Sequence, residues 1–192
     1  MVEVVTGEAR VMFVDNSAPT SVKVTFPFSW FGQIEESIRQ RVYIETTIPS
    51  FYYEVRTEPE MIARRNWTQA WWDSRRQAYQ LVTSVAVVDE LQAGRFPNQD
   101  QVLALLIDIS LVPVEPAIIE IVETYIQRMV MPRDPTGDAL HLALASYHKC
   151  DFLLTWNVQH LANANKFSHI RRINALLGLF TPALVTPLEL LA

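Results

Sequence analysis

Short apolar segments alternate with longer helical segments along this chain from residue 42 onward. The segments typical of strands are rich in β-branched and aromatic side chains and span 42–46, 81–84, 111–114, 152–156 and 183–186. Longer patterns between them predict helices over 60–79, 85–91, 99–109, 117–130, 136–149, 158–165 and 169–177. Strands that alternate with helices favour right-handed crossovers, and therefore a parallel sheet with helices on both faces. We predict an α/β protein with a three-layer α/β/α fold and a central parallel sheet.

The composition limits the class of protein further. A chain of 192 residues with 49% hydrophobic residues can bury one substantial core, and its single cysteine, Cys150, excludes an intrachain disulfide. The first residues lack the basic start and apolar run of a signal peptide. The longest uncharged stretch, 173–188, is interrupted by Gly178, Pro182 and Pro187, so we expect no membrane span. We expect a soluble, cytoplasmic protein.

The net charge of −5 argues against a protein that holds DNA mainly by neutralising phosphates. It does not argue against a nuclease. An active site built from carboxylates is itself negative, and a bound divalent cation inverts the local field.

The first 40 residues differ from the rest of the chain, so we divide it into an extension, 1–40, and a domain, 41–192. Apolar residues in the extension predict a β-hairpin around residues 16–19: Phe13, Val14, Val22, Val24, Phe26 and Phe28. The extension carries no polar cluster that suggests chemistry. It could be an added hairpin, an interaction arm, or the result of a start codon assigned too far upstream.

Four polar residues occupy comparable positions in the predicted topology. Glu45 ends the first strand of the domain, Glu90 lies two turns into the helix after 81–84, Asp138 lies in the first turn of its helix, and Asn157 follows strand 152–156. In a parallel sheet, positions at the carboxyl ends of strands converge on one cleft. We therefore expect the carboxyl groups of Glu45, Glu90 and Asp138 to converge, and their mutual repulsion to raise at least one pKa.

Each of these residues also has a simpler interpretation. Glu45 could be a solvated loop acid, and Glu90 a surface helix residue. Asp138 near a helix N-terminus is explained by the helix dipole, and Asn157 is a common turn residue. Their coincidence favours a site for Mg²⁺ or Mn²⁺, which prefer oxygen ligands and can activate water for attack on a phosphodiester. Asn157 would add a neutral oxygen ligand or orient a water.

Neighbouring residues suggest supporting roles. Thr46 and Thr155 could hold the acids by hydrogen bonds. His141 lies one helical turn after Asp138 and could contact RNA or a metal-bound water, although a structural histidine is the simpler interpretation. His148 and Cys150 lack an evident orienting acid, so we interpret both as structural.

The predicted helix 60–79 carries aromatic and basic residues. Trp71 and Trp72 could stack on bases, or pack in the core or a dimer interface. The pairs 64–65 and 75–76 are arginines that could contact RNA phosphates or an acidic partner, or form a solvated face.

Several separated motifs together resemble a known family. In chain order they read YIETTIPSFYYE, WW, TSVAVVDEL, GDALHLALASYHKCDFLLTWNVQHLAN and VTPLELL. They resemble a branch of the PIN-domain proteins, the VapC-like toxin ribonucleases of type II toxin–antitoxin modules. The resemblance covers Arg41 to Ala192 and does not reach residues 1–40.

The resemblance implies a PIN-like three-layer fold and an endoribonuclease that depends on Mg²⁺ or Mn²⁺. It also implies an RNA substrate, homodimerisation and inhibition by a cognate antitoxin. The family's three acids fall on Glu45, Glu90 and Asp138, as catalytic residues and metal ligands, and its last polar metal-binding position falls on Asn157. The first position is usually aspartate and the last is often aspartate. Glu45 is therefore one methylene longer than expected, and Asn157 removes a charge.

Two functions from different classes follow. The leading hypothesis is a metal-dependent endoribonuclease that hydrolyses RNA phosphodiester bonds as the toxin of a toxin–antitoxin pair. The alternative is a catalytically weakened binding module of the same fold that acts through RNA or antitoxin contacts. The acids Glu90 and Asp138 favour the enzyme, whereas Glu45 and Asn157 leave room for the module. A metal-dependent phosphatase lacks a recognisable phosphate loop or nucleophile motif.

Overall fold

The computed structural model describes residues 2–5, 8–11, 39–134 and 137–191. The chain divides into two compact units, residues 1–39 and 40–192. In the first unit, β1 (Val2–Val5) pairs antiparallel with β2 (Glu8–Val11). The hairpin that the sequence predicts around residues 16–19 lies outside the described residues.

The second unit is built on a five-stranded sheet. Its strands are β3 (Arg41–Ile44), β4 (Gln80–Ser84), β5 (Ser110–Val112), β6 (Phe152–Leu154) and β7 (Ala183–Val185). They pair in the order β5-β4-β3-β6-β7, and every pairing is parallel. The predicted central parallel sheet is therefore confirmed, with all five expected strands in place.

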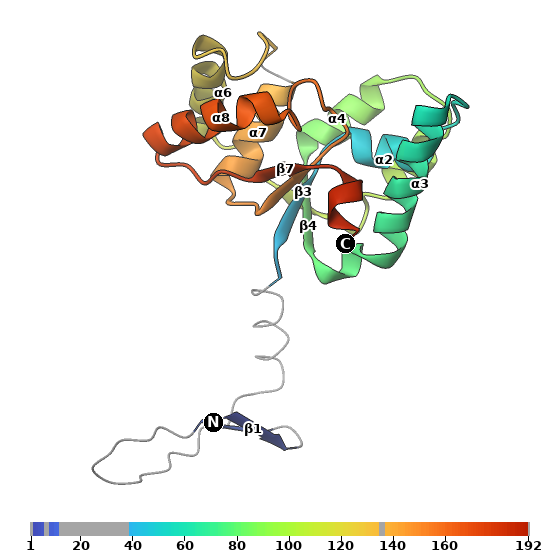
Figure 1. Cartoon of the computed structure of the whole chain (residues 1–192), viewed down its shortest axis with the longest axis vertical. Coiled ribbons are helices and arrows are strands. Elements are labelled where there is room, and N and C mark those ends of the chain that lie inside the picture. The colour runs from blue at the N-terminus through green and yellow to red at the C-terminus, as the bar shows by residue number, and fades with distance from the viewer. Residues whose placement is uncertain (1, 6–7, 12–38, 135–136, 192) are drawn as a thin grey trace. The chain divides into compact units, whose positions relative to one another are not determined.

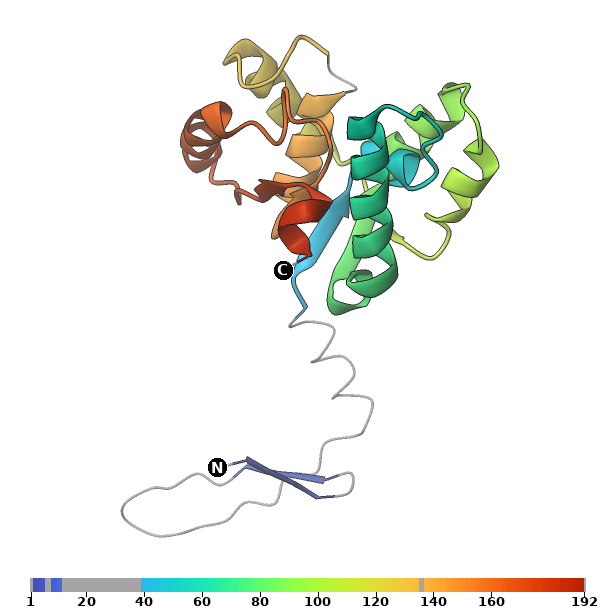
Figure 2. The ribbon, with the colours of Figure 1, turned by 45° about the vertical axis from the view of Figure 1, so that its right-hand side comes forward.

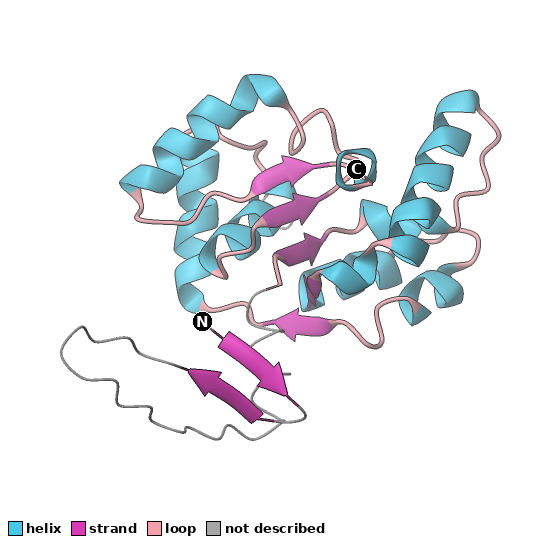
Figure 3. Cartoon of the chain, turned by 60° about the horizontal axis from the view of Figure 1, so that its bottom comes forward, coloured by secondary structure: helices cyan, strands magenta, loops and turns pink. Residues whose placement is uncertain are grey.

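Helices connect the strands. They are α2 (Thr47–Tyr52), α3 (Pro59–Ser74), α4 (Val85–Ala93), α5 (Gln99–Ala104), α6 (Pro116–Gln127), α7 (Asp138–Tyr147) and α8 (Ala164–Leu176), with short 3-10 helices η1 (Arg76–Ala78) and η2 (Pro187–Leu190). Helices α2 to α5 cover one face of the sheet and α6 to α8 the other (Figures 1, 2 and 3). This is the three-layer α/β/α arrangement that right-handed crossovers produce.

Several helical segments differ from the prediction. The helix expected over 60–79 ends at Ser74, and the chain continues as η1. The helix expected over 99–109 ends at Ala104. Of the two helices expected over 158–165 and 169–177, one forms: α8 begins at Ala164 and ends at Leu176. Residues 158–162 turn instead, because the backbone N–H groups of Leu161 and Ala162 both donate to the carbonyl of Asn157. The short helix α2 was not predicted, because Pro49 suggested a break; it lies in the first turn, where a helix tolerates proline.

The core lies on both faces of the central strand. Val42, Tyr43 and Ile44 of β3 are fully buried, as expected for a parallel strand covered by helices on both sides. Trp71 and Trp72 of α3 are also buried, at 0% and 2% exposure. The core interpretation of these two tryptophans is confirmed, and neither ring is available to stack on a base. Within the described ranges, no helix has the length and apolar character required to cross a membrane.

The strand order determines where a site can form. From β3 the chain moves outward through β4 and β5, then returns to the other side of β3 with β6 and β7. The direction of travel therefore reverses between β3 and β6. In open α/β sheets, this reversal opens a crevice at the carboxyl ends of the strands, where ligands bind.

Candidate active site

Glu45 follows β3 at this reversal point and is buried, with 5% of its surface exposed. Its Oε2 atom accepts hydrogen bonds from the backbone N–H of Thr47 at 3.0 Å, the hydroxyl of Thr47 at 2.5 Å and the hydroxyl of Thr155 at 2.8 Å. The first two bonds come from α2, and the third comes from the segment after β6. Both flanking elements therefore hold this carboxylate in one orientation.

Glu90 comes to the same edge of the sheet from α4, which follows β4. Its Oε2 atom accepts a hydrogen bond from the hydroxyl of Thr46, and its Oε1 atom lies 3.1 Å from Nε2 of His141. The expectation that Thr46 and Thr155 support the acids by hydrogen bonds is confirmed, one threonine for each glutamate.

His141 is buried on α7, with 1% of its surface exposed, and both of its ring nitrogens have partners. Nδ1 lies 3.0 Å from the hydroxyl of Tyr43, and that hydroxyl lies 2.7 Å from Oγ of Ser84. Ser84 occupies the predicted N-cap position of α4, but its side chain makes no capping bond. A buried chain of hydrogen bonds therefore leads from Glu90 through the imidazole to the sheet, and it fixes the orientation of the ring.

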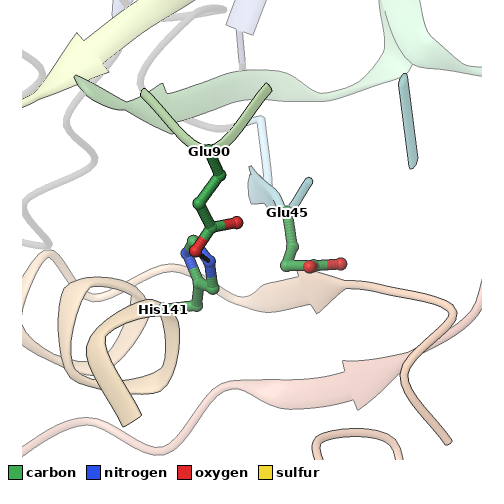
Figure 4. A group of neighbouring side chains, drawn as sticks. All are labelled: Glu45, Glu90 and His141. Atoms are coloured by element: carbon green, nitrogen blue, oxygen red, sulfur yellow. Dashed lines mark hydrogen bonds and ion pairs between the residues drawn. The ribbon is translucent and has the colours of Figure 1, made fainter. Parts of the chain in front are cut away.

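One possible ligand atom from each of Glu45, Glu90 and His141 lies within 4.8 Å of the other two. Figure 4 shows Glu90 and His141 directed toward one another, with Glu45 beside them. In the part of the chain that the structure describes, no other three acidic, histidine or cysteine side chains form such a group. Two carboxylate oxygens and one imidazole nitrogen fit a divalent cation. The nitrogen favours a transition-metal ion over Mg²⁺, which prefers oxygen.

Asp138 lies at the same edge, in the first turn of α7, but outside this group of three. Its Oδ1 atom accepts a hydrogen bond from Nδ2 of Asn157 at 2.7 Å. The amide oxygen of Asn157 accepts from the backbone N–H of His160 at 3.1 Å. In this orientation Asn157 presents its amide nitrogen to Asp138 and uses its oxygen to close the turn after β6. The structure thus brings Glu45 and Glu90 together with His141, and pairs Asp138 with Asn157 beside them.

Burial is the largest influence on the acids. It raises the pKa of Glu45, although the charge of His141 and the hydrogen bonds from the threonines oppose it. Burial also raises the pKa of Asp138, against the opposing charge of His160 and the bond from Asn157. The expectation that a pKa would be raised is confirmed in direction. The expected cause, mutual repulsion, is wrong, because burial dominates at both residues.

The pKa values of Glu90 and His141 shift in opposite directions. Burial acts to raise the pKa of Glu90, but the hydrogen bonds from His141 and Thr46 and the charge of His141 outweigh it and lower the pKa. Burial acts to lower the pKa of His141, but the bond to Glu90 and the charges of the nearby acids outweigh it and raise the pKa. Without a bound cation, Glu90 and His141 therefore each stabilise the charged form of the other.

The contribution of His141 to this group was underestimated from sequence, and those of Tyr43, Ser84 and Thr47 were missed. The available signal was the spacing between Asp138 and His141, because residues three apart share a helix face. No comparable signal identified Tyr43, which resembles any apolar residue of a buried strand.

Comparisons with known proteins add little to this geometry. No family model matches the chain, and no curated protein matches it. Among solved structures, the chain is similar to the crystal structure of FitAcB from Neisseria gonorrhoeae, with a TM-score of 0.47 and 15% sequence identity. The match covers 76% of this chain and 97% of that chain.

Proposed function

We propose that this protein is a metal-dependent endoribonuclease that hydrolyses RNA phosphodiester bonds. The observation that carries the proposal is the group formed by Glu45, Glu90 and His141 at the carboxyl edge of the sheet, where their possible ligand atoms lie within 4.8 Å of one another. Two carboxylate oxygens and an imidazole nitrogen this close together form a donor set that a divalent cation can occupy. Mn²⁺ suits this mixed oxygen and nitrogen donor set better than Mg²⁺.

In this proposal each residue has a defined task. Glu45 and Glu90 bind the cation, and His141 contributes its Nε2 atom while Tyr43 holds the ring through Nδ1. Asp138 lies beside the group and accepts a hydrogen bond from Asn157, so the pair would orient the attacking water or a further cation. A bound cation would lower the pKa of water and stabilise negative charge on the phosphoryl oxygens.

The partners in this proposal rest on the resemblance of the sequence motifs. They are an RNA substrate, a cognate antitoxin and a second copy of the chain, in the manner of a toxin–antitoxin pair. The geometry of the site supports only the proposed hydrolysis of a phosphodiester bond and does not bear on these partners.

The alternative, a catalytically weakened module that binds RNA or an antitoxin, is favoured by one observation. Asn157 presents an amide nitrogen, rather than an oxygen, to Asp138. Its N–H satisfies an oxygen of Asp138 that could otherwise bind a cation, and its amide oxygen accepts from the backbone of His160 instead of facing a cation.

The test combines metal binding with cleavage. Thermal unfolding is followed with EDTA, Mg²⁺ or Mn²⁺, and cleavage is followed on a pool of structured RNAs. An ion present at about 100 times its dissociation constant stabilises the fold by about 2.7 kcal/mol, which corresponds to about 5–10 °C in a domain of this size. Glu90→Gln and Asp138→Ala should abolish cleavage. Asp89→Asn, an exposed acid on the same helix as Glu90, is the matched control and should keep it.

The outcomes separate the candidates. Cleavage in Mn²⁺ that is lost in Glu90→Gln and kept in Asp89→Asn supports the nuclease. Binding of RNA without cleavage in either ion supports the module. If no ion stabilises the fold and the protein binds no RNA, both candidate functions are overturned.

A further inference from the structure

Three aromatic rings, from α2, α3 and the segment after β6, pack together beside the candidate site, and two of them are stacked. The ring of Phe51 on α2 lies 6.1 Å from that of Trp156, and Trp156 lies 6.0 Å from Trp67 on α3 in a stacked arrangement with 27° between the ring planes. Phe51 and Trp156 are buried, at 8% and 6% exposure, whereas Trp67 is 37% exposed. The two inner rings are therefore covered, and the outer ring is open to solvent.

The middle ring of this aromatic stack (Phe51, Trp156 and Trp67) is tied directly to the acids. Trp156 stands in sequence between Thr155, which donates to Glu45, and Asn157, which donates to Asp138. Its backbone N–H donates to the hydroxyl of Thr47 at 2.8 Å, and that hydroxyl donates to Glu45 at 2.5 Å. The stack is thus continuous with the site through two hydrogen bonds.

The indole of Trp156 is also fixed at its far end. Its Nε1–H donates to the hydroxyl of Thr68 at 2.7 Å, and Thr68 follows Trp67 directly on α3. The guanidinium of Arg64 lies over the ring of Trp156, 5.4 Å from its centroid, and donates to the carbonyl of Trp156 at 3.2 Å. Trp156 is therefore rigid, and a rigid inner ring gives Trp67 a fixed surface on which to stack.

The charges around the stack do not favour binding of phosphate. Arg64 pairs with Glu60, and Arg56, which lies over the ring of Phe51, pairs with Glu54. The chain as a whole carries a net charge of −5. A ligand at this stack would therefore depend on ring stacking more than on attraction between charges.

We propose that Trp67 is a stacking platform for an unpaired base of single-stranded RNA whose backbone crosses the candidate site. This inference rests on the proposed ribonuclease function and specifies how its substrate is held. An isolated exposed tryptophan would not support it, because single exposed apolar residues are common. The position of Trp67 supports it, because its ring stacks on Trp156, and the two sequence neighbours of Trp156 bond Glu45 and Asp138. Bases of any sequence can stack on an aromatic ring, so the platform would select unpaired RNA rather than a sequence.

The test measures binding separately from cleavage. A labelled single-stranded RNA of about 12 nucleotides is titrated in EDTA, and binding is followed by fluorescence anisotropy. Trp67→Ala should weaken binding by about 5- to 150-fold, and Trp67→Phe should retain most of the affinity. Phe180→Ala, which removes another exposed ring at 41% exposure, is the matched control and should leave binding unchanged. A second RNA of the same length without bases should bind wild type and Trp67→Ala equally.

Each outcome bears on the proposal. Equal affinities for Trp67→Ala and Phe180→Ala would overturn it, as would the absence of RNA binding by the wild type. Unchanged RNA binding together with lost self-association or lost binding of a protein partner would assign the ring to a protein interface instead. Weaker RNA binding in Trp67→Ala without cleavage by the wild type in Mn²⁺ would support the platform and overturn the nuclease. Cleavage by the wild type that is unchanged in Trp67→Ala would support the nuclease and overturn the platform.

Discussion

Replacing His141 by leucine tests the buried hydrogen-bond chain most directly. The substitution preserves most of the side-chain volume but removes two bonds, one to Glu90 and one to Tyr43. A hydrogen bond to a charged group contributes about 1.5–3 kcal/mol and a neutral one about 0.5–1.5 kcal/mol, so the free energy of unfolding should fall by about 2–4.5 kcal/mol. At about 2–4 °C per kcal/mol, the melting temperature should fall by about 4–18 °C.

The effect of His141 should also depend on pH in a defined direction. Burial acts to lower its pKa, but the bond to Glu90 and the charges of the nearby acids raise it above the ordinary histidine value of about 6.5. A histidine whose pKa is higher in the folded state than in the unfolded state stabilises the fold. This stabilisation is complete at pH values below the unfolded-state pKa. That stabilisation is lost as pH rises through the folded pKa. The difference in stability between wild type and His141→Leu should therefore narrow as pH rises above 6.5.

The assay is thermal unfolding in EDTA, followed by circular dichroism at several pH values from about 6 to about 9. His148→Leu, at the C-cap of the same helix, is the matched control. It removes one exposed bond, to the carbonyl of Pro113, and should cost under about 1.5 kcal/mol. If the difference in stability between wild type and His141→Leu is constant, or widens above pH 6.5, the raised pKa of His141 is refuted.

Three further predictions follow from the same geometry. Thr155→Val removes the bond to buried Glu45 and should lower the unfolding free energy by about 1–3 kcal/mol in urea denaturation, whereas Thr155→Ser should not; equal stability of the two variants would contradict this. Asn157→Asp places a carboxylate against Asp138 and should lower the melting temperature in EDTA but less in Mn²⁺; a rise in EDTA would count against the pairing. A chain that begins at Gln40 should melt cooperatively, because all five strands of the parallel sheet lie in 40–192; an unfolded product would show that the extension is needed.

The sequence predicted the three layers and the succession of strands and helices along the chain, because apolar segments rich in β-branched residues are distinctive. It also predicted that Glu45 and Glu90 would meet, since the carboxyl ends of parallel strands share one edge. The sequence could not decide which face of α7 points at the acids. Asp138 and His141 lie on nearly the same face, and the rotation that brings His141 into the group is set by packing on Tyr43 and Ser84.

The tryptophans of α3 are a second case in which the sequence could not decide which side chains are buried. Trp67 and Trp71 are one turn apart, so a helical pattern alone predicts that both face the core. The structure buries Trp71 and leaves Trp67 partly exposed, because Trp67 lies against Trp156 at the end of the sheet. The sequence placed the start of this helix to within one residue, but it could not place the helix along the edge of the sheet, because tertiary packing sets that position.

The central position of β3 has a consequence for how the protein is made. The bond between Thr155 and Glu45 joins residues 110 positions apart, and β3 pairs with β6 over a similar separation. A ribosome synthesises β3 early, but Glu45 gains this partner only after nearly the whole domain has emerged. Contacts between such distant residues form late, because the intervening chain must first lose its freedom. Nascent chains should therefore carry Glu45 for many seconds before its group with Glu90 and His141 is complete, since synthesis proceeds at about 5–20 residues per second.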